Sequence, residues 1–162
     1  KTRRATARQH LMPFTTYTFP KYRAANHHLL ICDRLEAIER GDCKRLMVFM
    51  PPRHGKSQLV SIQFPAWYLG RNPEKQFMAA SYSARLASSF GRRVRNLLAE
   101  RRFANVFPDV ALAPDSKARD EWHTRQGGVY VAAGVGGSIT GKGADVLSLD
   151  DPVKGQIGRA HV

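Results

Sequence analysis

Residues 50–57 read Met-Pro-Pro-Arg-His-Gly-Lys-Ser, and they lie between an apolar run and a segment that favours a helix. The apolar run Leu-Met-Val-Phe at 46–49 predicts a short buried strand, and Gln-Leu-Val-Ser-Ile at 58–62 predicts the start of a helix. A strand, a tight loop ending in Gly-Lys-Ser and a helix together are typical of a phosphate-binding loop. The reason is that successive backbone N–H groups and a helix N-terminus form a concave anion site. An ordinary surface turn is the alternative.

The loop meets the pattern G-x-x-x-x-G-K-[ST] at its last three positions, and Met50 stands where the pattern has its first glycine. In this interpretation Lys56 neutralises charge on the β- and γ-phosphates of a nucleotide, and the Ser57 hydroxyl ligates Mg²⁺.

A second segment, Asp-Val-Leu-Ser-Leu-Asp-Asp at 145–151, predicts an apolar strand that ends in two carboxylates. A parallel strand beside the strand of the phosphate loop delivers an acidic residue to Mg²⁺, which is the Walker B arrangement. Asp150 is then the predicted metal ligand, and Asp151 the predicted general base that polarises the attacking water. The alternative is a strand followed by an Asp-Asp-Pro turn, since Asp and Pro are common turn formers.

These two segments together resemble the large terminase subunit of tailed bacteriophages and, more narrowly, the ATPase domain of its DNA-packaging motor. The resemblance rests on residues 51–57 and 149–154, extends to 136–145 and 27–41, and covers roughly residues 10–154.

Two positions depart from the common pattern of such ATPases. Met50 replaces glycine, which is usual for terminases, whose loop often holds an arginine such as Arg53. Asp151 stands where many related ATPases carry glutamate, which shortens the reach of the predicted base by one methylene.

The resemblance implies that the chain is an ATP hydrolase with ATP and Mg²⁺ as cofactors. Lys56, Arg53 and Asp151 are the predicted catalytic residues, with Arg53 stabilising the γ-phosphate in the manner of a cis arginine. Ser57 and Asp150 are the predicted Mg²⁺ ligands. Nucleotide binding is assigned to Pro52, Arg53, His54, Gly55, Lys56, Ser57 and Gln58.

The partners that the resemblance implies are double-stranded DNA, the small terminase subunit and the portal protein. Full-length subunits are expected to form a ring on the portal and to drive DNA into the procapsid, in the host cytoplasm. The nuclease half of such proteins is expected to be absent from this fragment. Two rivals stay open: a helicase-like DNA-dependent ATPase, and a non-catalytic basic DNA-binding fragment.

Composition agrees with a polyanion partner. The 162 residues carry 26 Lys and Arg against 13 Asp and Glu, a formal net charge of +13. Because the positive residues are spread along the chain, they favour nucleic acid over a membrane surface, although a basic protein that merely avoids aggregation is the alternative. Two cysteines predict neither a disulfide framework nor a metal pair, and no apolar run approaches the ~20 residues of a membrane span.

We predict three parts: an extended arm at 1–20, an incomplete P-loop ATPase domain at 21–154, and a non-native tail or truncation scar at 155–162. In terminase-like and helicase-like ATPases a segment before the first helix packs on adenine, so the resemblance makes the aromatic residues of the first part and its border candidates to stack on the base, with Gln9 reading its edge. The alternative is that these rings simply pack in the core. These aromatic residues are Phe14, Tyr17, Phe19 and Tyr22. The predicted fold class is α/β, a P-loop NTPase with a parallel-sheet core and helices on both faces.

Between the two motifs, the pattern predicts a helix at 26–40 capped by Gly41, a strand at 76–82 and a helix at 84–102. Ser81 and Ser83 are predicted to face a ligand or to cap that second helix. Its basic face is solvated or contacts DNA phosphates, and carries Arg85, Arg92, Arg95 and Arg102.

Arg93 lies at the edge of the apolar stripe of this second helix, so it is expected to snorkel or pair. Two further strands are predicted around 125–127 as a hairpin. The resemblance also implies a mobile glycine-rich loop at the nucleotide or DNA face, at 134–143, with Thr140 and Lys142 as its polar groups.

Overall fold

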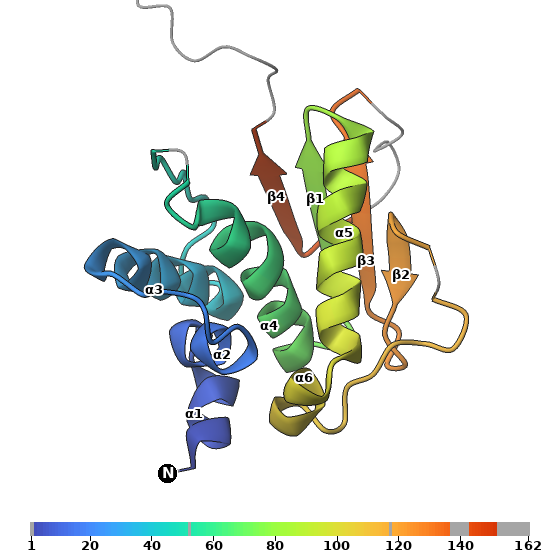
Figure 1. Ribbon diagram of the computed structural model, residues 1–162. Helices are drawn as coiled ribbons and strands as arrows, with labels where there is room; N and C mark the ends of the chain where they lie inside the picture. The colour runs from blue at the N-terminus through green and yellow to red at the C-terminus, as the bar shows by residue number, and fades with distance from the viewer. Residues whose placement is uncertain (1, 52, 117, 137–142, 152–162) are drawn as a thin grey trace, which may run out of the picture.

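The computed structural model describes residues 2–51, 53–116, 118–136 and 143–151. It is an α/β arrangement in which a four-stranded mixed sheet has the strand order β2-β3-β1-β4 (Figure 1). The elements in chain order are α1 (Arg3–Gln9), α2 (Leu11–Thr18), α3 (Asn26–Arg40), the π-helix η1 (Ser57–Gln63), α4 (Phe64–Arg71), β1 (Gln76–Ser81), α5 (Ala84–Ala99), α6 (Arg101–Val106), β2 (Glu121–His123), β3 (Val129–Gly134) and β4 (Val146–Asp150).

The three longer strands are parallel, and their carboxyl ends meet at one edge of the sheet. β1 pairs with β3 and with β4, and this register places Ser81 opposite both Gly134 and Asp150. β2 pairs antiparallel with β3, which confirms the predicted hairpin and makes the sheet mixed rather than purely parallel. The topology therefore brings the acidic end of β4 beside the end of β1.

The described helices cover only one face of this sheet. Phe77 and Tyr130 are register partners on that face; rings from α4 pack on Phe77, and Gly91 of α5 lies against Tyr130. On the opposite face Leu147 and Leu149 are 54% and 58% exposed. The prediction of helices on both faces is therefore wrong for the part of the chain that the structure describes.

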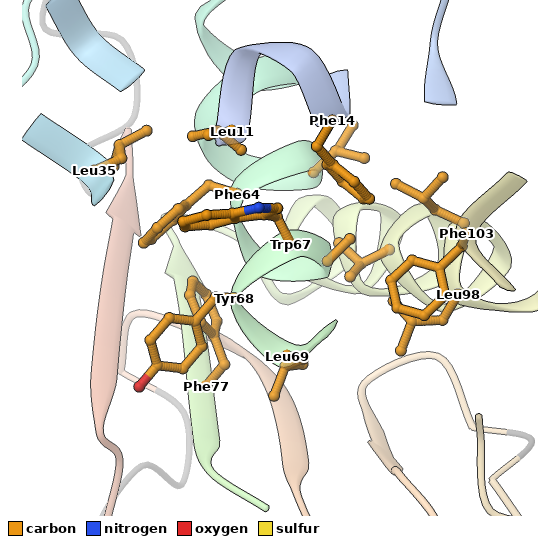
Figure 2. Close-up of a cluster of buried hydrophobic side chains, with 14 of the residues drawn as sticks. Leu11, Phe14, Leu35, Phe64, Trp67, Tyr68, Leu69, Phe77, Leu98 and Phe103 are labelled. Carbon is orange, nitrogen blue, oxygen red and sulfur yellow. The ribbon is translucent and has the colours of Figure 1, made fainter. Parts of the chain in front are cut away.

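The core lies between the sheet and the helices. Figure 2 shows Trp67 of α4 among side chains from α2, α3, α6 and the sheet. Phe14 packs edge-on against Phe103, with ring centroids 6.2 Å apart, and Phe14 is fully buried. For Phe14, core packing is thus the correct alternative, and stacking on adenine is excluded by its burial.

Three aromatic rings also stack across neighbouring strands of the sheet. Trp122 lies 4.8 Å from Tyr130 at an interplanar angle of 4°, and Tyr130 lies 5.9 Å from Phe77 at 1°. All three side chains are almost fully buried. Because offset aromatic pairs stabilise beyond their buried area, this stack fixes β2 and β3 against β1.

The expected extended arm at 1–20 is wrong, because α1 and α2 occupy most of it. The side chain of Thr2 caps α1 by accepting from the Ala5 N–H, and buried Thr15 and Thr18 donate their hydroxyls to carbonyls four residues earlier. Pro13 lies in the first turn of α2, where backbone N–H groups have no helical partner to lose. Apolar burial on the core, rather than intrinsic propensity, selects the helix here.

The predicted strand at 46–49 is also wrong. No described strand pairs with this segment, and Met47 and Phe49 are 83% and 87% exposed. Leu46 and Val48 point the other way and pack against the core, so the side chains do alternate with a period of two. In the described part of the chain β4 therefore pairs with β1 and with no strand from the segment that leads into the Gly-Lys-Ser loop.

Other boundaries agree with the sequence or shift slightly. α3 has its predicted bounds, and Gly41 ends it in the left-handed conformation at φ 84°. The second predicted helix stops at Ala99, because the backbone of Glu100 is extended, so Arg102 belongs to α6 and not to the basic face of α5. Every helix in the described ranges is too short or too polar to cross a membrane.

Candidate functional site

The loop at 50–57, called the Gly-Lys-Ser loop below, turns sharply before η1. Arg53 and Gly55 both have left-handed backbones, with φ 63° and φ 81°. The carbonyl of Gly55 accepts from the Leu59 N–H at 3.1 Å, which starts the helical hydrogen bonds directly after the turn. Local π-helical geometry, as in η1, is frequent at functional sites.

A pocket of about 350 Å³ opens beside this loop. It is lined by Met50, Pro51, Arg53, Gly55, Lys56, Ser57, Gln58 and Asp151. The structure thus brings five of the predicted nucleotide-binding residues together with the predicted general base. Pro52 lies outside the described residues.

Lys56 lies between the two carboxylates at the end of β4. Its Nζ is 3.3 Å from Oδ1 of Asp150 and 3.4 Å from Oδ1 of Asp151. Burial disfavours the charged amine, but the attraction and hydrogen bonds of the two carboxylates outweigh it and raise the pKa of Lys56 above its ordinary value. Lys56 is therefore protonated at neutral pH, and the two carboxylates hold its amine in place.

Asp150 is the more buried of the two acids. Its other oxygen accepts from the Ser61 hydroxyl at 2.9 Å, and its side chain is only 11% exposed. Ser57 lines the neighbouring pocket, but its hydroxyl makes no hydrogen bond to Asp150 within the described residues. That Ser57 and Asp150 ligate the same Mg²⁺ stays a prediction. It requires Asp150 to give up its contacts with Lys56 and Ser61.

Asp151 stands at the mouth of the pocket. Its side chain is 68% exposed, and its backbone is left-handed at φ 44°, which is uncommon for a residue other than glycine. The backbone carbonyl accepts from the Tyr82 N–H at 3.2 Å, so the end of β1 holds this turn in place. A carboxylate so placed is open to water and to a ligand in the pocket.

Two residues that the motifs did not reveal hold the Gly-Lys-Ser loop from behind. Buried His28 accepts at Nδ1 from the Ala25 N–H, so its Nε2 carries the proton and donates to the His54 carbonyl at 2.7 Å. The Tyr22 hydroxyl donates to the Gly55 carbonyl at 3.4 Å, and its ring packs on His28. Tyr22 therefore supports the loop, whereas the sequence offered it only as an adenine contact or a core residue.

Other predicted polar residues have clear positions. The Ser83 hydroxyl accepts from the Leu86 N–H and caps α5, while the buried Ser81 hydroxyl, beside Asp150, finds no hydrogen-bond partner in the described ranges. Arg93 donates to Gln58 at 2.6 Å, which confirms that it pairs, and burial lowers the pKa of this guanidinium.

Two segments with earlier predictions lie outside the described residues. They are 137–142, with Thr140 and Lys142, and 155–162.

Gly55→Ala is expected to destabilise the fold and weaken anion binding at the loop. A left-handed backbone costs a non-glycine residue about 1–2 kcal/mol, and the new Cβ would lie 3.1 Å from the Tyr22 hydroxyl. Gly41→Ala is the matched control, because its φ is also positive and nothing lies within 4 Å of its Cβ. Urea unfolding should show a lower free energy of unfolding in both variants, while phosphate affinity should fall in Gly55→Ala alone. Equal phosphate affinities would contradict the role of the loop.

Taken together, these features define an α/β protein in which a Gly-Lys-Ser loop faces two carboxylates at the carboxyl edge of parallel strands. A family model described as terminase large subunit, T4likevirus-type, N-terminal, matches residues 47–156. The chain belongs to this terminase family, which confirms the resemblance, and the matched range includes both the loop and β4. Comparisons with curated proteins and with solved structures gave no match.

Proposed function

We propose that this chain is the P-loop ATPase motor domain of a phage terminase large subunit, which hydrolyses ATP to drive DNA into a procapsid. The observation that carries the proposal is the position of Lys56, between Asp150 and Asp151 at a pocket that Arg53 and Ser57 also line. Family membership supports the packaging role in general.

The residues present fit a nucleotide phosphate chain with Mg²⁺. The pocket volume of about 350 Å³ lies within the range of small-molecule sites. Arg53 and Lys56 supply positive charge, and Gly55 lets the backbone approach a ligand closely because it has no Cβ. Ser57 and Asp150 supply the hydroxyl and carboxylate oxygens that Mg²⁺ prefers.

Each residue then has a defined task. Lys56 exchanges its two carboxylates for the phosphates, and Arg53 stabilises charge on the γ-phosphate. Ser57 and Asp150 hold Mg²⁺, which neutralises charge on the phosphate oxygens when bound. Asp151, exposed at the mouth of the pocket, accepts a proton from the attacking water.

The proposed partners follow from charge and family. A formal net charge of +13 suits double-stranded DNA. The portal protein, the small terminase subunit and further copies in a ring are proposed from the family alone, as is action in the host cytoplasm at the portal.

The proposal predicts Mg²⁺-dependent ATP hydrolysis that double-stranded DNA stimulates, without separation of the strands. Phosphate release would be measured with and without a blunt duplex, and a forked duplex would report unwinding. Hydrolysis with unwinding would favour the helicase-like rival. Nucleotide binding without turnover, with or without DNA, would contradict the motor and leave a binding fragment.

A further inference from the structure

A second hollow lies between α5 and residues 118–120, which lead into β2. Its volume is about 820 Å³, and no described residue lines both this hollow and the pocket beside the Gly-Lys-Ser loop. The lining residues are Arg85, Ser88, Ser89, Arg92, Ala118, Arg119 and Asp120, and we call this hollow the arginine groove.

One wall of the arginine groove is a face of α5. Residues at i, i+3, i+4 and i+7 of a helix share a face, and positions 85, 88, 89 and 92 have this spacing. The opposite face of α5 is held in the core by buried Val94 and Leu98. The helix therefore cannot rotate these side chains away without losing its apolar packing.

The other wall is tied to the same helix. Arg95 donates to the Ala118 carbonyl at 2.9 Å, and Trp122 donates its indole N–H to the Gly91 carbonyl at 3.2 Å. The backbone carbonyl of Arg119 approaches Gly91 so closely that no Cβ would fit there. The groove is thus a preformed feature of the fold, built on a glycine contact that only the tertiary structure reveals.

The groove carries positive charge that no ion pair among the described residues neutralises. Arg85, Arg92 and Arg119 are exposed, and none has an ion-pair or hydrogen-bond partner within the described residues. Asp120 is the one acidic residue among the described residues that line the groove. Three guanidinium groups against one carboxylate favour an anionic ligand.

We propose that the arginine groove binds the phosphate backbone of double-stranded DNA. Arg85 and Arg92 are seven positions apart, a rise of about 10.5 Å along the helix, so they form a line of charge and not a single point. Arginine and serine are common donors to DNA phosphates, and the guanidinium fork matches phosphate geometry. Such contacts position a duplex without reading its sequence.

The lining argues against a protein partner. Protein interfaces concentrate binding energy in buried aromatic and other large apolar anchors, whereas Ala118 is the sole apolar side chain among the described residues that line this groove. A duplex needs no such anchor, because release of counterions from its phosphates supplies affinity.

The groove and the Gly-Lys-Ser site are joined through α5. Arg93 on this helix donates to Gln58 at the start of η1, and the N–H of Tyr82, just before α5, holds the turn at Asp151. This proposal deepens the proposed function by naming the surface that takes DNA, and its biological meaning rests on that function. The binding itself requires no nucleotide.

Fluorescence anisotropy with a labelled random-sequence duplex tests the proposal. Arg85→Ala combined with Arg92→Ala should weaken binding by at least about tenfold, and it should flatten the plot of log affinity against log salt by about 0.9 per lost phosphate contact. The control combines Arg101→Ala with Arg102→Ala, which removes the same charge from exposed positions on α6. Thermal unfolding would verify that both double variants are folded.

Equal losses of DNA affinity in the two double variants would overturn the proposal, because net charge alone would then explain binding. Competition by a polyaspartate peptide as effective as competition by unlabelled duplex would also overturn it. Lys44→Ala, at an exposed lysine outside the groove, should bind DNA like the wild type. The two proposals can fail separately. If the wild type does not hydrolyse ATP but the groove variant alone loses DNA affinity, the proposed motor is rejected and the DNA-binding surface is retained.

Discussion

Asp151→Asn is expected to lower ATP hydrolysis by about 10²–10⁴-fold, the usual contribution of a positioned general base. The amide keeps the shape of the carboxylate but cannot accept a proton from water. Nucleotide affinity should be retained or rise, because Lys56 loses one of the two carboxylates that compete with phosphates for it. Phosphate release at saturating nucleotide and equilibrium binding would be measured side by side.

Asp109→Asn serves as the control, since Asp109 is an exposed acid outside the pocket. It should leave both hydrolysis and affinity unchanged. Hydrolysis in Asp151→Asn within about twofold of wild type would remove Asp151 as the base, because a lost base costs far more than that.

Trp122→Ala is expected to reduce the free energy of unfolding by about 3–5 kcal/mol, the usual cost of deleting a buried tryptophan side chain. Trp122 is fully buried and stacks on Tyr130, and its indole N–H donates to the Gly91 carbonyl. The substitution therefore opens a cavity beneath β2 and frees a buried carbonyl at the same time. Urea or thermal unfolding of the two proteins would give the difference.

Trp122→Phe separates the contribution of ring packing from that of the indole hydrogen bond. It keeps an aromatic ring against Tyr130 and loses the hydrogen bond, so it should cost less than Trp122→Ala. A loss below about 1 kcal/mol in Trp122→Ala would show that the stack does not hold the sheet together, since core cavities of this size cost several times more.

The sequence predicted that Asp150 and Asp151 lie at the same site as Lys56, although they are far apart in the chain, but it did not predict the ion pairs between them. Two local patterns were enough: a Gly-Lys-Ser turn before a helix, and an apolar strand that ends in two acids. Parallel strands share one carboxyl edge, so the second pattern had to deliver its acids to an end of the sheet. The strands β1 and β4 were predicted from apolar runs, the β2–β3 hairpin from two strand-like runs around 125–127, and α3 from the helical spacing of its apolar residues.

Errors arose where a distant partner decides the local structure. All four residues at 46–49 are apolar, so the sequence indicates neither which side chains face the core nor whether a neighbouring strand is present to pair with. At 1–20, the Thr, Tyr, Phe and Pro residues have weak helix propensity, and packing of Leu11 and Phe14 on the core overrides it.

Supporting residues were missed for the same reason. His28 was visible as a histidine at the start of a helix, but its hydrogen bond to the His54 carbonyl depends on where α3 lies against the loop. The arginine groove likewise needs residues 118–120 to pack on Gly91, a contact between segments distant in the sequence. The basic face of α5, which forms one wall of the groove, was predictable from the sequence. The other wall, at residues 118–120, was not.

The central claim is that Lys56 binds nucleotide phosphates, and isothermal titration calorimetry of Mg²⁺-ATP with wild type and Lys56→Ala tests it most directly. Loss of a charge-assisted contact worth about 2 kcal/mol or more should weaken binding by about 30-fold or more in Lys56→Ala. Lys44→Ala, at an exposed lysine outside the pocket, should bind like the wild type. Equal affinity in wild type and Lys56→Ala, or no binding by the wild type, would contradict the claim.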